Sequence, residues 1–284
     1  MIPTSFEYAR ATSLDDALAK LTAAGDGGKI IAGGHSLVPL MKLRLSEPQS
    51  LVDISRLPEL KGIEERDGRI SVGAATVHHD VATSDILQAQ CPALAEAAAS
   101  IGDPQVRNRG TIGGSVAHAD PAADIPAVLL ALDAEIHLKS RRGARTVKAA
   151  DFFRGLFSVD MRADEIITSV QFAPVRSAAY AKLHQRASHY AIVGVAAALD
   201  VRDGAIASAR VAVTGATSHA TRLGNVEQAL AGQPLSQATI DTAAGLAAQD
   251  LEEWNADIHA SADYRRAMVQ VFARRALSSA MARS

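Results

Sequence analysis

Residues 30–45 read IIAGGHSLVPLMKLRL, and residues 110–115, further along the chain, read GTIGGS. Each segment places two adjacent glycines beside a hydroxyl-bearing residue. Because glycine has no Cβ and tolerates positive φ, successive backbone amides can point into one concavity that suits a phosphate group. One glycine pair alone is more often an ordinary tight turn. Two such pairs predict two anchors for a pyrophosphate, since an amide bond to a charged oxygen contributes roughly 1.5–3 kcal/mol.

The two loops do not fit the common nucleotide or hydrolase motifs. The chain contains neither G-x-G-x-x-G nor G-x-x-x-x-G-K-[ST], and GGHSL does not match the G-x-S-x-G nucleophile elbow. If a nucleotide binds, the architecture around it is therefore neither a Rossmann fold nor a P-loop fold.

Composition narrows the class of protein. With 284 residues, 48% of them hydrophobic, the chain can bury a large core. Its 29 basic and 31 acidic side chains give a net charge of -2, so no sequence-wide field attracts nucleic acid or an anionic membrane. One cysteine, Cys91, excludes a disulfide framework and any iron–sulfur cluster built by this chain alone. The N-terminus resembles no signal peptide and no long apolar segment occurs, which predicts a cytoplasmic location.

Periodicity and turn signals predict a mixed order of helices and strands. Ser13 caps a helix that ends at Gly25, and Asp203-Gly204 centres a hairpin over residues 191–216. A domain boundary is expected at residues 174–178, where Pro174 follows a strand. Further strands are expected at 29–34, 51–54, 69–76, 134–140, 165–173 and 179–185, and helices at 78–88, at 92–102 and from about 225 to the end.

The segments IIAGGHSLVPLMKLRL and IGDPQVRNRGTIGGSVAHADPAADIPAVLLALDAEI resemble the FAD-binding medium subunit of the molybdenum hydroxylases, the carbon monoxide dehydrogenase and xanthine dehydrogenase family. The resemblance extends over essentially the whole chain. It implies an α+β fold with an FAD-binding domain of the PCMH, or vanillyl-alcohol-oxidase-like, type at 1–176, in subdomains of about 1–55 and 56–176. A C-terminal domain of an antiparallel sheet with helices, of the carbon monoxide dehydrogenase flavoprotein type, would follow at 177–284.

The resemblance also implies a set of cofactor-binding residues. The two glycine loops would hold the pyrophosphate, and Asp124 would accept hydrogen bonds from ribose hydroxyls. Ile167 would pack near the isoalloxazine, Lys182 would contact the flavin, and Ile101 stands where xanthine dehydrogenases carry an aromatic residue over the adenine. The full set is Ala32, Gly33, Gly34, His35, Ser36, Leu37, Ile101, Thr111, Gly113, Gly114, Ser115, Asp124, Ile167 and Lys182. No residue of the chain is expected to act as a catalytic acid or base, or as a metal ligand.

The function implied is that of an electron-transfer subunit. FAD, held without a covalent link, would receive electrons from [2Fe–2S] clusters of a small partner subunit and release them to an external acceptor. A large molybdopterin subunit would carry the substrate site, in a dimer of heterotrimers. One alternative is a stand-alone FAD- or nucleotide-binding protein of the same fold without redox catalysis. Another is an autonomous FAD oxidase, although the residues after the boundary are few for a substrate domain.

Other polar groups have ordinary interpretations. His78-His79-Asp80 is expected to be solvated surface, because adjacent side chains point apart. His118 and Asp120 are expected to fix the second loop, since a metal site needs a fuller ligand set. Arg107 and Arg109 either add positive potential for phosphates or are ordinary surface groups.

Overall fold

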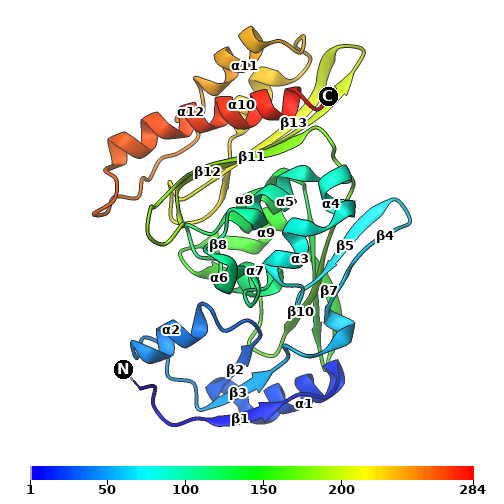
Figure 1. Cartoon of the computed structure of the whole chain (residues 1–284), viewed down its shortest axis with the longest axis vertical. Helices are drawn as coiled ribbons and strands as arrows, with labels where there is room; N and C mark the ends of the chain where they lie inside the picture. Colours follow the sequence, from blue (N-terminus) through cyan, green and yellow to red (C-terminus); the bar gives the residue numbers. More distant parts are fainter. Residues whose placement is uncertain (1) are drawn as a thin grey trace.

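Three sheets organise the chain and follow one another from the N-terminal to the C-terminal part of the molecule (Figure 1). The computed structural model describes residues 2–284. The first sheet is small and parallel, in the order β1-β3-β2. It consists of β1 (Glu7–Arg10), β2 (Gly28–Ile31) and β3 (Ser50–Asp53), and it is accompanied by α1 (Leu14–Ala24), the 3₁₀ turn η1 (Gly25–Gly27), α2 (Leu37–Lys42) and the 3₁₀ turn η2 (Pro58–Leu60).

Helix α1 forms as its sequence predicts. The Ser13 side chain accepts a hydrogen bond from the amide of Asp16, and Gly25 ends the helix at φ +57°. Apolar side chains on one face of α1 are buried with residues of β3 and of the following loop, in a core that also includes Ile166. This core fixes where β2 ends, and so where the first glycine loop starts.

The second sheet is antiparallel, in the order β4-β5-β10-β6-β7. Seven helices and a short β8-β9 ribbon belong to the same unit, and α8, whose residues are all buried, runs through the largest apolar cluster. The strands are β4 (Ile63–Arg66), β5 (Arg69–Gly73), β6 (Glu135–Ser140), β7 (Gly143–Lys148), β8 (Phe153–Gly155), β9 (Ser158–Val159) and β10 (Ile166–Phe172); the helices are α3 (His78–Thr83), α4 (Asp85–Gln90), α5 (Pro92–Ala99), α6 (Pro104–Arg107), α7 (Ile112–His118), α8 (Asp124–Ala131) and α9 (Ala149–Phe152).

The third sheet is antiparallel, in the order β11-β12-β13-β14, and is covered on both faces. Helix α12 lies across one face, whereas α5 and α8 of the preceding unit contact the other. Its elements are β11 (Ala178–His184), β12 (Ala191–Arg202), β13 (Ala205–Thr214), β14 (Thr221–Arg222), α10 (Gly224–Leu230), α11 (Gln237–Ala244) and α12 (Ala262–Met281).

Alternation along β12 explains this double burial. Val193, Val195 and Ala197 belong to the cluster on the α12 side, whereas Ala196 and Ala198 belong to the cluster that contains α8. A strand buried on both faces reads as a continuous apolar run. The alanines leave room for α8 to lie close to the sheet, so the C-terminal unit is packed directly against the helix that begins at Asp124.

The predicted strands are present, including the hairpin, whose turn residues Asp203 and Gly204 have φ of +51° and +74°. The helix expected at 78–88 is instead two short helices, α3 and α4, separated at Ser84, whose side chain caps α4. The sequence did not reveal the short or polar strands β1, β4, β7, β8, β9 and β14. The C-terminal part is less helical than expected, because residues 245–261 form turns between α11 and α12. Within residues 2–284, no helix combines the length and apolarity needed to cross a bilayer.

Candidate functional site

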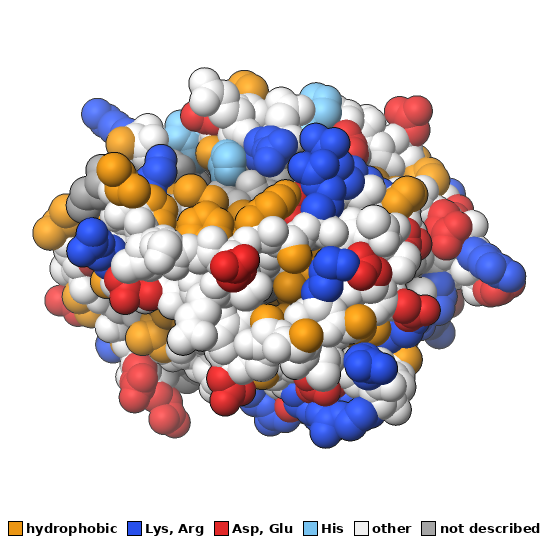
Figure 2. Space-filling view, turned by 90° about the horizontal axis from the view of Figure 1, so that it is seen from below, with side chains coloured by type: hydrophobic (Ala, Val, Ile, Leu, Met, Phe, Trp, Pro, Cys, Tyr) orange, Lys and Arg blue, Asp and Glu red, His pale blue; other side chains and the backbone are white. Residues whose placement is uncertain are grey.

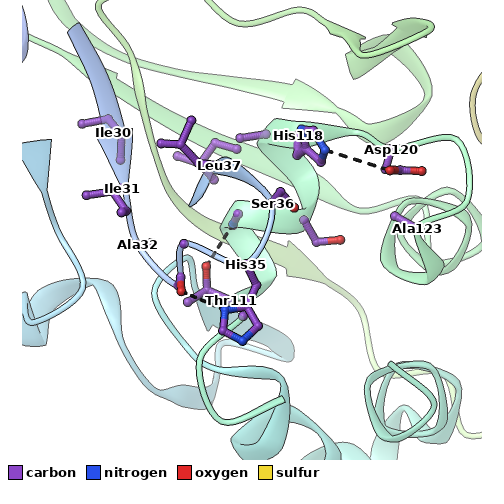
Figure 3. A pocket seen from close by; sticks show the side chains of 18 of the residues that line it. Ile30, Ile31, Ala32, His35, Ser36, Leu37, Thr111, His118, Asp120 and Ala123 are labelled. Carbon is purple, nitrogen blue, oxygen red and sulfur yellow. Dashed lines mark hydrogen bonds and ion pairs between the residues drawn. The ribbon is translucent and has the colours of Figure 1, made fainter. Parts of the chain in front are cut away.

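A cavity of about 810 Å³ lies between the first and second units, within the usual size range of cofactor and small-molecule sites. Both glycine loops line it (Figure 3), together with residues 157–167 and residues 188–190. Every residue named above as cofactor-binding lines the cavity except Lys182. Seen from the N-terminal end (Figure 2), the surface carries an apolar patch beside basic and histidine side chains, with acidic groups scattered around it.

The two loops touch each other at Gly33. A Cβ on this residue would lie 2.1 Å from the carbonyl oxygen of Arg109 and 2.8 Å from the Cα of Gly110. The neighbouring Gly34 has φ +74°, which turns the chain toward α2. Glycine is therefore required here for two separate reasons, close backbone approach at Gly33 and a left-handed conformation at Gly34.

The first loop offers free backbone donors. Within residues 2–284, the amides of Gly33, Gly34, His35 and Ser36 donate no hydrogen bond to another protein group. The loop instead accepts bonds, since the Gly34 and Ser36 carbonyls receive the amides of Val38 and Leu40. Four adjacent free amides at a cavity wall are a donor set that suits the oxygens of a pyrophosphate.

The second loop differs from what the sequence suggested. The Ile112 and Gly113 amides donate to the carbonyls of Thr76 and Ala74 at 3.0 and 2.9 Å, and the Gly114 amide donates to Thr111 Oγ1 at 3.1 Å. These amides hold α7 against the end of β5. Among the side chains of this loop, the hydroxyls of Thr111 and Ser115 can donate into the cavity.

His78 is buried, which corrects the expectation of a solvated surface for the His78-His79 pair. Only 5% of His78 is exposed, whereas His79 faces solvent. The His78 amide donates to the Gly110 carbonyl, its ring lies against Gly110, and its Nδ1 is buried without a partner. Burial, reinforced by nearby His35, lowers the pKa of His78 to about 4, so the imidazole is neutral near pH 7.

Asp124 is held by two residues of β11. Tyr180 Oη donates to Asp124 Oδ1 at 2.5 Å, and Lys182 Nζ donates to Asp124 Oδ2 at 2.8 Å and to the Ser100 carbonyl at 3.1 Å. The side chains of Lys182 and Asp124 are each 5% exposed. Lys182 thus lies behind Asp124, as its ion partner. Gly194 on β12 makes space for the Tyr180 hydroxyl, because a Cβ there would lie 2.1 Å from it.

The segment before α8 is held by further bonds from the C-terminal unit. Thr214 Oγ1 donates to the carbonyls of Pro121 and Ala123, both at 2.8 Å, and the Gly215 amide donates to Pro121 at 2.7 Å. The Ala191 amide donates to Ala122 at 3.2 Å. Consequently the residues that lead into Asp124 are positioned by β12 and β13, and not only by their own unit.

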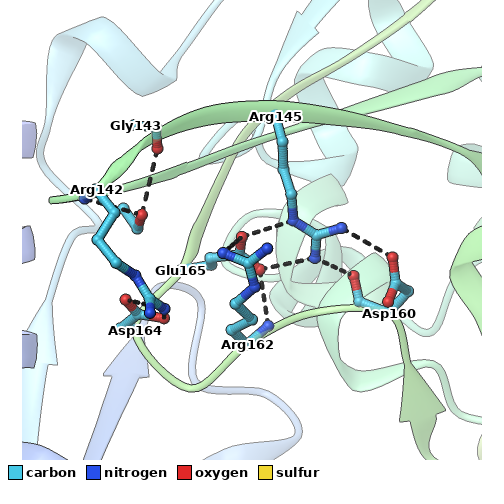
Figure 4. Close-up of polar contacts among 8 residues, drawn as sticks. Arg142, Gly143, Arg145, Asp160, Arg162, Asp164 and Glu165 are labelled. Atoms are coloured by element: carbon cyan, nitrogen blue, oxygen red, sulfur yellow. Dashed lines mark hydrogen bonds and ion pairs between the residues drawn. The ribbon is translucent and has the colours of Figure 1, made fainter.

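A partly buried ion-pair network shapes the wall formed by residues 157–167 (Figure 4). Arg145 on β7 donates to both carboxylate oxygens of Glu165, at 2.7 and 2.9 Å, and also to Asp160. Glu165, 2% exposed, accepts a third bond from the Arg162 amide. The hydrogen bonds from Arg145 lower the pKa of Glu165, so this carboxylate stays charged and holds the wall in place.

Two other sequence-based expectations concern groups near the loops. His118 Nε2 lies 4.0 Å from Asp120 Oδ2, at the end of α7, and both line the cavity (Figure 3). Burial lowers the pKa of His118 although Asp120 opposes the shift. Arg107 donates to the carbonyls of Ile101 and Gly102 at 3.0 Å, so it fixes the loop before α6. Among residues 2–284, no cluster of three or more His, Cys, Asp or Glu side chains is arranged to hold a metal ion.

Sequence reasoning missed the cavity residues that come from other elements. Phe157, His78 and Tyr190 line the cavity but belong to no glycine motif. The one available signal was Leu156-Phe157, two large apolar residues between Gly155 and Ser158, which is an unusual composition for a hairpin tip.

Comparison with known proteins places this geometry in a family. Residues 4–174 match the family described as the FAD binding domain in molybdopterin dehydrogenase, and residues 178–280 match the CO dehydrogenase flavoprotein C-terminal domain. The carbon monoxide dehydrogenase medium chain of Hydrogenophaga pseudoflava is 40% identical over 286 residues, covering 100% of this chain and 99% of its own.

Two further comparisons agree. Subunit alpha of the 6-hydroxypseudooxynicotine dehydrogenase complex of Paenarthrobacter nicotinovorans is 41% identical over 288 residues, covering 100% of this chain and 97% of its own. The solved structure of the Hydrogenophaga pseudoflava carbon monoxide dehydrogenase that lacks the Mo-pyranopterin moiety superposes with a TM-score of 0.95, covering 100% of this chain and 99% of that chain at 40% identity. The chain therefore belongs to the FAD-binding medium subunits of the molybdenum hydroxylases, and it is an oxidoreductase subunit whose cofactor is FAD.

Proposed function

We propose that this chain holds FAD without a covalent link, takes up electrons from [2Fe–2S] clusters of a small partner subunit and passes them to an external acceptor. The observation that carries the proposal is the set of four free amides, Gly33 to Ser36, in a cavity of cofactor size. Their arrangement suits a pyrophosphate, the central group of a dinucleotide. The adjoining second loop adds the Thr111 and Ser115 hydroxyls.

The other proposed contacts follow from the lining of the cavity. Ala32 and Leu37 flank the amides, and Gly114 allows α7 to approach the phosphates without a Cβ in the way. Gly113 lines the same cavity, and its missing Cβ allows α7 to pack against Ala74. Ile101 and Ile167 offer apolar surfaces to the rings. When bound, FAD supplies reversible electron uptake, and the protein supplies binding, orientation and a fixed electrostatic environment.

Asp124 and Lys182 would act together. The Asp124 carboxylate lines the cavity, where it would accept hydrogen bonds from ribose hydroxyls, while Tyr180 and Lys182 hold it from behind. Lys182 would thus support the cofactor through Asp124. No proton transfer by a side chain is required, because electron transfer needs neither a general acid nor a general base.

We place the substrate chemistry on a different chain. The relatives named above belong to enzymes named for different substrates, carbon monoxide and 6-hydroxypseudooxynicotine, at nearly equal identity to this chain. Substrate choice would therefore lie on a large molybdopterin subunit. We further propose a dimer of heterotrimers in the cytoplasm, with FAD bound by residues 1–176 and the unit 177–284 closing the cavity behind Asp124.

The test is the visible spectrum of the purified chain before and after acid precipitation. A flavin band that passes into the supernatant, and is identified there as FAD, supports a noncovalent flavoprotein. Affinity purification of the tagged chain from its own host then reports on partners, with iron and molybdenum measured in the eluate. A chain that takes up added FAD and elutes without iron or molybdenum would refute the proposed complex, and a chain that takes up no FAD would refute the site.

A further inference from the structure

Phe157 combines three unusual properties at the mouth of the cavity. It stands between β8 and β9 at φ +51°, a left-handed conformation that bulky side chains rarely adopt. It is 53% exposed although it is aromatic. It also lines the cavity, whereas its neighbour Leu156, 62% exposed, does not. Strained backbone at the rim of a ligand site is where a functional constraint is expected.

The Phe157 ring has a defined direction. Its centroid lies 5.1 Å from that of His118, with the two planes inclined by 37°. His118 is the last residue of α7, the helix that begins at the second glycine loop. A helix of this length extends about 10 Å, so Phe157 stands roughly that far along the cavity from Thr111.

This position identifies which ring of a dinucleotide would lie there. The two rings of a dinucleotide extend to opposite sides of its pyrophosphate. On one side of the loops the cavity is lined by Ile101 and Gly102, beside the buried Lys182–Ser100 contact. At the far end of α7 from the second loop it is lined by Phe157, beside His118. The rate of electron transfer falls steeply with the distance between donor and acceptor. The redox-active ring of the cofactor is therefore expected at the more exposed end of the cavity, where the distance to an external partner is shortest.

We propose that Phe157 covers the isoalloxazine end of the cavity, with His118 behind it, and excludes water from the face of that ring. The left-handed backbone at residue 157 directs the side chain over the cavity rather than outward into solvent. This inference rests on the proposed binding of FAD and adds a residue that contacts the flavin ring.

The test compares Phe157→Gly and Leu156→Gly in the full-length chain, freed of FAD and titrated with FAD or with ADP. ADP carries the adenine, ribose and diphosphate but no isoalloxazine. Phe157→Gly should raise the dissociation constant of FAD about tenfold, the size expected for losing one aromatic contact, and leave that of ADP unchanged. Iodide should also quench the fluorescence of bound flavin more strongly in Phe157→Gly than in wild type.

Thermal unfolding of the same FAD-free proteins separates this role from a structural one. Glycine adopts φ +51° without strain, so Phe157→Gly should melt at or above the wild-type temperature while binding FAD more weakly. Phe157→Tyr should keep wild-type affinity, and Leu156→Gly should bind both ligands normally. Equal FAD affinity in Phe157→Gly and wild type would overturn the proposal, as would an equal loss for FAD and ADP. A wild-type chain that binds ADP but not FAD would instead overturn the proposed function.

Discussion

Replacing Gly33 with alanine tests whether the contact between the two loops positions the phosphate donors. The added Cβ would start 2.1 Å from the Arg109 carbonyl oxygen, and real Cβ atoms essentially never come closer than 3.0 Å. The atoms that the Cβ would meet are backbone atoms of Arg109 and Gly110, so no side-chain rotation relieves the clash. Gly33 itself does not have positive φ, and the effect of the substitution is therefore purely one of separation.

The expected magnitude has two parts. Forcing packed backbone segments apart costs about 1–3 kcal/mol, which lowers the melting temperature by about 2–4 °C for each kcal/mol. The shift also moves the free amides of Gly33 to Ser36 relative to Thr111 and Ser115. Losing one amide bond to a charged oxygen costs roughly 1.5–3 kcal/mol, so the dissociation constant of FAD should rise about ten- to a hundredfold.

The assay is titration of the FAD-free chain with FAD, followed by flavin fluorescence and repeated by calorimetry. Gly155→Ala is the matched control, because its Cβ would meet nothing within 4 Å and its φ is not positive. This control should behave as wild type. A Gly33→Ala chain with unchanged melting temperature and FAD affinity would refute the argument, and a chain that is less stable yet binds FAD normally would show that the loop contact does not position the donors.

Three further predictions concern buried polar groups. The pKa of His78 is about 4 in the folded chain, against 6.5 for an unperturbed histidine. The free energy of unfolding should therefore be unaffected by His78 above pH 6.5 and should fall by about 3 kcal/mol as pH drops to 4, because the unfolded chain binds the proton more tightly. Urea unfolding across this range should show a shallower decline in His78→Gln. Arg145→Met strands the buried Glu165 carboxylate and should cost about 2–3 kcal/mol near pH 7, less than for a fully buried pair because Arg145 is partly exposed. The loss should begin to shrink as pH falls through 4.5, the pKa of an unperturbed glutamate, and should disappear only below the lowered pKa that Glu165 has in the folded chain. Equal stability of the two proteins at pH 7 would contradict this. Lys182→Met should lower the unfolding free energy by about 3–5 kcal/mol, and adding Asp124→Asn should restore part of it, because the cost comes from an unpaired buried carboxylate; a double variant no more stable than Lys182→Met would show that the pair is not coupled.

Hydrophobic periodicity was sufficient to predict a strand or helix from the sequence wherever that element buries one or both of its faces. Helix α1 and strand β12 carry their patterns in the sequence, and the glycine loops are recognisable from their residues. By contrast β7 reads GARTVK and buries only Val147, so an edge strand facing solvent leaves no pattern to detect. Strand β4 reads IEER and buries no residue fully.

The polar interior of the site was harder to predict than its loops. Nothing near His78 in the sequence signals that its ring packs under Gly110, because that burial depends on a contact with a distant loop. The pairing of Lys182 with Asp124 joins β11 to α8, and a single sequence gives no such pairing. The occupied amides of the second loop likewise depend on carbonyls of Ala74 and Thr76. The glycine pattern predicts where donors can approach a ligand, whereas tertiary contacts decide which donors stay free.

The bonds from β11, β12 and β13 to residues 121–124 have a consequence for how such chains can be recombined. The two family domains meet between residues 174 and 178, yet a chain cut there would leave Asp124 without Tyr180 and Lys182, and Pro121 without Thr214. In a chimera that joins the first 176 residues to the C-terminal half of a relative, the relative must supply equivalents of Tyr180, Lys182 and Thr214 at positions that reach residues 121–124. Exchange between relatives should therefore succeed more readily at the exposed Asp203-Gly204 turn than at the linker itself.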